Sequence, residues 1–334
     1  RAADAADQAG FDLNYVRGRG HHPSETDERF NMAVFAIRNA GFVNAVAELH
    51  GVVSREMARP GWPEHPVDEI PITSVTNGIH TRTFLSEEML ALWNSVDAFN
   101  DPAGLHRLDL GEIWRVRNAT RRRLVDWTRL RLTKRAMRRE ADDIAAARHA
   151  LDPDVLTIGF ARRFATYKRG DLILRDRDRI KRLLAGPNPV QIVFAGKSHP
   201  KDDNGKRILQ EIVRFTQEPG VRGKVVFLED YDLEMARYLV QGVDIWLNTP
   251  RRPMEASGTS GMKAVINGAL HCSVLDGWWA EAYHPDLGFS IGVGDMPEDH
   301  ELADRREAED LYTLLERDII PMFCGTAFKN KGVQ

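Results

Sequence analysis

The sequence lacks the features that mark secreted, membrane-spanning and nucleic-acid-binding proteins. Its 334 residues include only two cysteines, which leaves no disulfide framework and suits a reducing compartment. No apolar run approaches the length of a membrane span, and the amino-terminal residues contain no apolar signal segment. The net charge is −3, which gives neither nucleic acid nor an anionic membrane a reason to bind. We therefore expect a globular, cytoplasmic protein with no nucleic-acid or membrane partner.

Common nucleotide and metal motifs are also missing. No GxGxxG fingerprint follows a predicted strand, which argues against a nicotinamide dehydrogenase. Lys263 is preceded by Met262 and followed by Ala264, so it does not belong to a Walker A loop. His21 and His22 have no third ligand at metal spacing, and no metal site is predicted.

The amino-terminal part of the chain has mainly helical and loop signals. Apolar residues at helical spacing predict one or two buried helices within 30–57. Prolines mark 60–71 as a loop, and 72–79 resembles a short strand that ends at the turn pair Asn77-Gly78. Residues 86–150 carry three helical patterns and almost no strand signal.

The last of these helical patterns is rich in arginine and lysine. Such a run usually marks a solvated helix face, and the average overall charge disfavours nucleic-acid binding. The basic residues of the run are Arg121, Arg122, Arg123, Arg129, Arg131, Lys134, Arg135, Arg138 and Arg139.

Beyond Asp152-Pro153 the pattern changes to short, β-rich apolar runs separated by helix-like segments. Strands that alternate with helices predict an α/β fold with a parallel, doubly wound, Rossmann-like sheet, in which ligands bind at the carboxyl ends of strands. A further helix-like segment should end at Pro321. The expected strands are 155–160, 190–194, 224–228, 244–247 and 270–275, and the expected helices are 170–184, 204–217, 233–241, 262–269 and 307–320.

One segment combines small residues with a lysine: Glu255-Ala-Ser-Gly-Thr-Ser-Gly-Met-Lys263. Its residues 257–261 have little side-chain bulk, so their backbone N–H groups can close around an anion at the start of a short helix. Lys263 would lie beside that anion, where a buried amine can form an imine with an aldehyde. The combination suggests pyridoxal phosphate. A plain helix cap is the commoner explanation of such a turn, so the pattern by itself leaves both open.

A second segment, 159–169, places four cations and a tyrosine in the turn after the first strand of the predicted sheet. Arginine forks are suited to bidentate phosphate binding, and lysine supplies a point charge. A basic surface loop is an equally good explanation of the residues alone.

Two longer segments identify a family. The run Asn267-Gly-Ala-Leu-His-Cys-Ser-Val-Leu-Asp-Gly-Trp-Trp-Ala-Glu281, together with Asn248-Thr-Pro-Arg-Arg-Pro-Met-Glu255, closely resembles the α-glucan (glycogen, starch, maltodextrin) phosphorylases. The ending 276–281 resembles the short bacterial and archaeal branch. The resemblance covers most of residues 30–320. It implies a glycosyltransferase that uses pyridoxal 5′-phosphate and transfers a glucosyl unit from an α-1,4-glucan to inorganic phosphate, giving α-glucose 1-phosphate.

The resemblance also implies roles for individual residues. Lys263 matches the lysine that binds the cofactor covalently, while Arg163 and Lys168 match the residues that bind the substrate phosphate; these are the three catalytic candidates. The candidates for holding the cofactor are Lys263, Thr259, Ser260, Arg162 and Tyr231. The candidates for binding the glucosyl unit are Glu255, Ser257, Gly258, Tyr167 and Asn77.

The family has a glycosyltransferase-B fold of two Rossmann-like domains, and the resemblance sets expected boundaries. Residues 1–77 are expected to be the largely helical remnant of the first domain. Residues 78–334 are expected to be the cofactor- and phosphate-binding domain, helical over 86–150 and with its sheet from 151. Family members are much longer, so we expect a fragment that is inactive alone, with a foreign or shifted tail at 324–334. The full-length protein is a candidate homo-oligomer.

Two other functions remain open at this stage. A nucleotide-sugar glycosyltransferase of the same fold also uses basic loops after strands, but it has no lysine that binds pyridoxal phosphate. A non-catalytic glucan-binding fragment would release no glucose 1-phosphate. Absorbance of the imine distinguishes the first alternative, and an assay for glucose 1-phosphate distinguishes the second.

Overall fold

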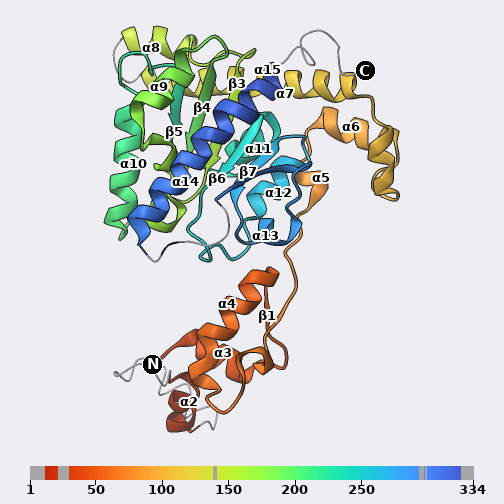
Figure 1. Ribbon diagram of the computed structural model, residues 1–334, viewed down its shortest axis with the longest axis vertical. Coiled ribbons are helices and arrows are strands. Elements are labelled where there is room, and N and C mark those ends of the chain that lie inside the picture. The colour runs from red at the N-terminus through yellow and green to blue at the C-terminus, as the bar shows by residue number, and fades with distance from the viewer. Residues whose placement is uncertain (1–11, 22–29, 138–140, 293–296, 298, 325–334) are drawn as a thin grey trace.

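The computed structural model describes residues 12–21, 30–137, 141–292, 297 and 299–324. Figure 1 shows a small amino-terminal lobe (red to orange) below a large α/β body, with an extended segment between them. Residues 75–80 of that segment have no regular secondary structure, so the turn predicted at Asn77-Gly78 is wrong.

The large body is built on a six-stranded parallel sheet with the strand order β5-β4-β3-β6-β7-β8. The chain enters at the centre with β3, moves outward through β4 to β5, and returns to the other side of β3 with β6. This is the order of a doubly wound, Rossmann-like sheet, and its topological switch point lies between β3 and β6. The strands are β3 (Leu156–Ala161), β4 (Val190–Ala195), β5 (Val225–Leu228), β6 (Ile245–Asn248), β7 (Leu270–Val274) and β8 (Gly288–Ile291).

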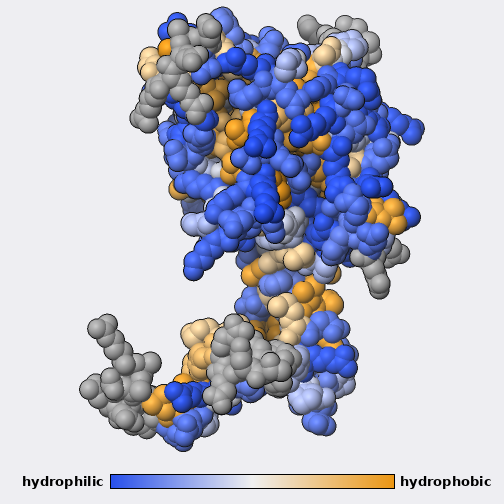
Figure 2. Space-filling view, turned by 90° about the vertical axis from the view of Figure 1, so that its left-hand side faces the viewer, coloured by the Kyte–Doolittle hydropathy of each residue, from blue (hydrophilic) through white to orange (hydrophobic). Residues whose placement is uncertain are grey.

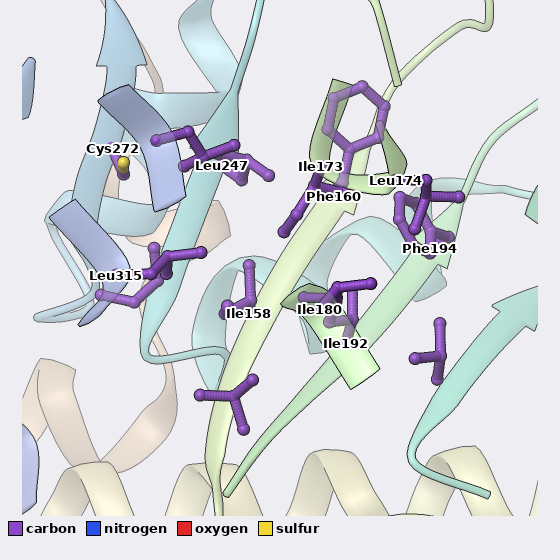
Figure 3. Packing of buried hydrophobic residues seen from close by; sticks show 14 of the residues in the cluster. Ile158, Phe160, Ile173, Leu174, Ile180, Ile192, Phe194, Leu247, Cys272 and Leu315 are labelled. Atoms are coloured by element: carbon purple, nitrogen blue, oxygen red, sulfur yellow. The ribbon is translucent and has the colours of Figure 1, made fainter. Parts of the chain in front are cut away.

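Alternate residues of the central strands face two separate hydrophobic cores. In β4, Ile192 and Phe194 belong to one core, whereas Val193 and Ala195 belong to the other. Figure 3 shows the first core, where side chains of β3 and β4 meet those of the covering helices. Because both faces of the sheet are buried, these strands appear in the sequence as continuous apolar runs.

Helices cover both faces of the sheet, and aspartates start most of them. Asp109, Asp176, Asp202, Asp232 and Asp299 each accept a backbone N–H of the first turn, which satisfies donors that the helix leaves unpaired. The described helices include none that is long and apolar enough to cross a membrane. The helices packed on the first core are α9 (Arg177–Ala185), α10 (Asp203–Phe215) and α14 (His300–Leu314), and those on the second are α7 (Leu110–Ala136), α11 (Leu233–Gly242) and α12 (Thr259–Val265).

The elements of the sheet agree closely with the sequence prediction. Each of the five predicted strands is present with both ends within one residue of the expected position, but the short strand β8 was missed. The predicted final helix begins earlier, at His300, and does not end at Pro321. A π-helical turn at Leu315–Ile319 interrupts it, and Pro321 lies just after that turn, in α15 (Ile320–Cys324).

The helical character of 86–150 is confirmed by α6 (Glu87–Ser95), α7 and α8 (Ala141–Arg148). The basic run, assigned to the last pattern, lies on α7 instead, and its Arg138 and Arg139 fall outside the described residues. The prediction that the basic run lies on a solvated face is wrong for Arg121, which is 4% exposed. Its guanidinium donates to Asp244 at 2.8 Å, and Arg117 on the same helix is also buried against Asp244. The arginines therefore anchor α7 to the start of β6.

The small lobe contains helices around a two-residue parallel strand pair. Helices α3 and α4 confirm the predicted pair of helices, but they are not buried: Met32 is 68% and Met57 is 72% exposed. The small apolar cluster of the lobe joins Ala58 of α4 to Ala45 of the strand pair and to loop residues such as Ile70. The elements of the lobe are α2 (Leu13–Gly20), α3 (Met32–Asn39), β1 (Asn44–Ala45), α4 (Glu48–Ala58) and β2 (Thr73–Ser74).

Among the described residues, the hydrogen bonds between the two bodies converge on one side chain of the large body. Glu281, on α13 (Trp279–Ala282), accepts the backbone N–H of Glu48 at 3.0 Å and the hydroxyl of Thr76. Glu48 is the first residue of α4, so this carboxylate also lies at the positive end of that helix. Figure 2 shows apolar side chains gathered around the junction and on the lobe below it.

Candidate active site

Two loops lie side by side at the switch point of the sheet. One follows β3 and begins at Arg162, and the other follows β6 and begins at Thr249. β3 and β6 are parallel neighbours, but the chain continues from β3 to one side of the sheet and from β6 to the other. The loops after the two strands therefore diverge, and the crevice between them is where such sheets bind ligands.

Arg169 joins these two loops. Its backbone is left-handed (φ 43°), and its guanidinium donates to the carbonyl oxygens of Thr249 at 3.0 Å and Pro250 at 2.7 Å. The same side chain pairs with Asp304 at 2.9 Å and with Glu307, both on α14. Arg169 is one of the four cations of the segment 159–169, a candidate phosphate loop. Its side chain instead binds the loop after β6 and helix α14, and it thereby holds the loop after β3 in position.

A buried charge cluster forms where the loops meet. The Oε2 atom of Glu255 accepts from Arg162 at 2.8 Å and from Lys168 at 2.9 Å, and all three side chains are at most 10% exposed. Burial acts to raise the pKa of Glu255, but the two cations outweigh it and hold the pKa below its usual value. Glu255 is therefore a carboxylate, and its one charge is shared by two cations.

The backbone around this cluster is held by a second acid. The two oxygens of Asp276 accept the backbone N–H groups of Glu255 at 2.9 Å and Gly277 at 2.8 Å. Burial raises the pKa of Asp276 to about 6, although these hydrogen bonds work in the opposite direction. Arg162 is fixed on its other side by Asn248 at the end of β6.

The predicted small-residue turn is present and starts helix α12. Gly258 is the N-cap residue with φ 83°, a left-handed conformation that glycine adopts without strain. Thr259 and Ser260 form the first turn of the helix. The hydroxyl of Ser257 is buried and has no hydrogen-bond partner among the described residues.

Aromatic side chains support this turn from below. A Cβ atom added to Gly261 would lie 2.6 Å from the ring of His271, so the turn packs directly on that imidazole. His271 stacks on Trp278, with ring centroids 5.5 Å apart, and Trp278 also lies under Gly258. Within the described part of the chain, Nε1 of Trp278 has no hydrogen-bond partner, and neither nitrogen of His271 makes a well-formed hydrogen bond, although the Trp246 backbone is near enough to act on the pKa of the ring. The site thus holds several buried polar atoms that a polar ligand would satisfy.

Lys263 lies on α12, the helix that follows the small-residue turn, and is half-buried. Its Nζ is 4.4 Å from the centroid of the Phe84 ring. Burial lowers its pKa, because the charged ammonium loses hydration there. A lower pKa increases the share of neutral amine, which is the form that attacks a carbonyl carbon.

The other predicted site residues have different environments. Tyr167 is half-buried beside Lys168, whose Nζ is 4.9 Å from the ring centroid. Tyr231 is half-buried against the second core, and burial raises the pKa of its hydroxyl. Arg163 is exposed, and Asn77 is exposed in the segment between the two bodies.

The structure therefore brings Arg162, Lys168 and Glu255 together, but it does not bring Arg163 or Asn77 into the same cluster. Asp276 and His271 were not predicted to have a role in the site. Both lie in the segment 267–281 that carried the family resemblance, which was their only available signal.

The fold and the site define a doubly wound α/β protein with a buried cluster of two cations and one carboxylate at the carboxyl edge of its sheet. The family described as carbohydrate phosphorylases matches residues 19–284, and the chain belongs to this family. The resemblance stated from the sequence is thus confirmed.

Relatives are found among archaeal and bacterial phosphorylases. The chain is 41% identical over 309 residues to the maltodextrin phosphorylase of Thermococcus litoralis, covering 89% of this chain and 36% of that protein. It is 44% identical over 304 residues to the glycogen phosphorylase of Mycobacterium tuberculosis H37Rv, covering 88% and 35%. The glycogen phosphorylase of Aquifex aeolicus is 40% identical over 329 residues, covering 95% and 47%. The chain therefore spans about a third to a half of the length of these relatives.

Proposed function

We propose that this chain carries the cofactor- and phosphate-binding part of an α-glucan phosphorylase. The reaction would transfer a glucosyl unit from an α-1,4-glucan to inorganic phosphate and give α-glucose 1-phosphate. The observation that carries the proposal is the pair of buried cations on Glu255 at the carboxyl edge of the sheet, followed in the chain by α12 with its desolvated Lys263. The family membership supports this reaction class.

The residues at the turn fit pyridoxal 5′-phosphate. Ser257, His271 and Trp278 present buried polar atoms without partners among the described residues, and Lys263 presents an amine of lowered pKa. Lys263 would hold the cofactor covalently, while the backbone N–H groups of Thr259 and Ser260 would hold its phosphate. When bound, the cofactor supplies a phosphate group that relays a proton beside the substrate phosphate.

The side chains of the crevice would then bind and orient the substrates. Lys168 would hold phosphate oxygens, as the sequence predicts, and Arg162, which was expected at the cofactor, would join it because both cations meet on Glu255. Together they would stabilise negative charge close to the developing oxocarbenium ion of the glucosyl unit. Glu255 would accept hydrogen bonds from sugar hydroxyls, with its backbone fixed by Asp276. Arg163, which is exposed at the rim, is proposed to reach the same phosphate from the outside.

The small lobe is proposed to belong to the first domain of a glycosyltransferase-B arrangement, with residues 1–77 on that side and 78–334 on the other. The two-residue parallel pair β1–β2 supports this, because parallel strands normally lie within larger sheets covered on both faces. Exposed Phe42 and Met57 would be covered by that sheet. Asn77, between the bodies, would then face the sugar from the opposite wall of the cleft.

Covalent labelling tests the proposal directly. The chain is incubated with pyridoxal 5′-phosphate, reduced with borohydride and digested, and the labelled peptide is identified by mass spectrometry. We expect the label on Lys263 and its loss in Lys263→Arg. The matched control Lys197→Arg, which changes a lysine just after β4, should keep the label. A label on another lysine, or none in a folded chain, would refute the assignment and favour a glycosyltransferase without this cofactor.

A further inference from the structure

Glu255 has a charge environment that its proposed role in sugar binding does not require. One oxygen, Oε2, is shared between Arg162 at 2.8 Å and Lys168 at 2.9 Å. These are the two cations to which the proposed function gives phosphate. In the ligand-free chain the protein's own carboxylate thus occupies the position on Lys168 that a phosphate oxygen would need.

The backbone and the carboxylate of Glu255 are held by different groups. Its backbone N–H donates to Asp276 at 2.9 Å, so the main chain is fixed independently of the cations. Among the described residues, the partners of its carboxylate are Arg162 and Lys168. A rotation about the side-chain bonds can therefore release the carboxylate while the loop after β6 stays in place.

We propose that Glu255 is an intramolecular counter-ion that substrate phosphate displaces, so that phosphate binding frees this carboxylate to accept the sugar hydroxyls. The inference rests on the proposed phosphate role of Arg162 and Lys168. Two cations and one carboxylate leave one positive charge uncompensated, whereas two cations and a phosphate dianion are balanced. The pair of cations therefore stabilises the phosphate dianion more strongly than it stabilises the single carboxylate. Phosphate also offers more oxygens that can accept hydrogen bonds.

The exchange makes the two substrates cooperate. Sugar binding needs a free Glu255, and phosphate binding provides it, so each ligand should raise the affinity for the other by the same factor. A purely structural ion pair would behave differently. If Glu255 only positioned Lys168 and Arg162, its removal would misplace the cations and weaken phosphate binding.

The two explanations predict opposite changes in phosphate affinity for the substitution Glu255→Gln. Phosphate affinity is measured by titration calorimetry on the 334-residue chain without cofactor, at constant ionic strength, for wild type and Glu255→Gln. We expect Glu255→Gln to bind phosphate more tightly, by about tenfold or more, because a charge-assisted competitor has been removed. Glu255→Asp, whose shorter side chain cannot bridge both cations, should shift affinity in the same direction by less. Glu301→Gln is the matched control, because Glu301 is an exposed carboxylate that pairs with Arg175 and touches neither cation.

Each outcome bears on a different claim. Tighter binding in both Glu255 variants but not in the control supports the exchange. Weaker or unchanged binding in folded Glu255 variants overturns it and leaves the proposed function standing. No phosphate binding in any form, including wild type, overturns the exchange together with the phosphate role of the cluster, while the label on Lys263 still tests the cofactor role separately.

Discussion

The stability of the large body should depend on pH in part through His271, a fully buried imidazole. Its ring is 0% exposed, stacks on Trp278 and packs under Gly261. Burial lowers its pKa to about 3, with the nearby charge of Arg162 adding to the effect and the backbone of Trp246 opposing it. The folded protein therefore keeps this ring neutral at any pH near physiological values.

Proton linkage gives the sign and the size of the change in the free energy of unfolding with pH. Between the folded pKa of about 3 and an unfolded pKa of about 6.5, the unfolded chain binds a proton at His271 that the folded chain does not. The free energy of unfolding must then fall as the pH is lowered through this window. For one such group, lowering the pH from 7 to 5 costs about 2 kcal/mol, a large part of the net stability of a typical domain.

Urea unfolding at several pH values measures this contribution. Other groups also titrate, so the informative quantity is the difference between wild type and His271→Gln. We expect this difference to change by about 2 kcal/mol between pH 7 and pH 5, with the variant losing less stability on acidification. Trp278→Phe is the matched control, because it perturbs the same stack but keeps the imidazole and so keeps the pH dependence. A difference between wild type and His271→Gln that does not vary with pH would refute the reasoning.

Three further outcomes are expected. Gly261→Ala should lower the free energy of unfolding by about 1–3 kcal/mol in thermal or urea unfolding, because its Cβ would lie 2.6 Å from the His271 ring; an unchanged stability would show that the turn can move away. Lys168→Ala should weaken phosphate binding by about tenfold or more in calorimetry while borohydride labelling at Lys263 persists, and the reverse result would mean that the two roles are interchanged. Glu281→Gln should speed proteolysis in the segment between the two bodies, since it weakens their hydrogen-bonded contact, and an unchanged cleavage rate would contradict that role.

Local sequence patterns determined the elements of the sheet and their order. A strand buried on both faces needs a continuous apolar run. That signal lies within the strand itself. Strands β3 to β7 could therefore be located almost to the residue, and the loops after β3 and β6 could be named as candidate ligand loops.

Predictions of burial and of helix ends were wrong where they depended on residues far away in the sequence. Arg121 was expected in solvent and is buried, because Asp244 lies under α7. The helices of the small lobe were expected to be buried, yet Met32 and Met57 are exposed. Pro321 was expected to end a helix, but the chain stays helical through it, directly after a π-helical turn.

The sequence by itself thus determined the family, the order of strands and helices, and the types of residue in the candidate site. Only the tertiary structure decided which of those residues act together. Lys168 and Glu255 are 87 positions apart, and they meet because the switch in strand order makes β3 and β6 neighbours. The role of a charged side chain depends on the groups that folding places beside it. Arg169 therefore holds two loops and α14 together, whereas Arg162 and Lys168 pair with one carboxylate.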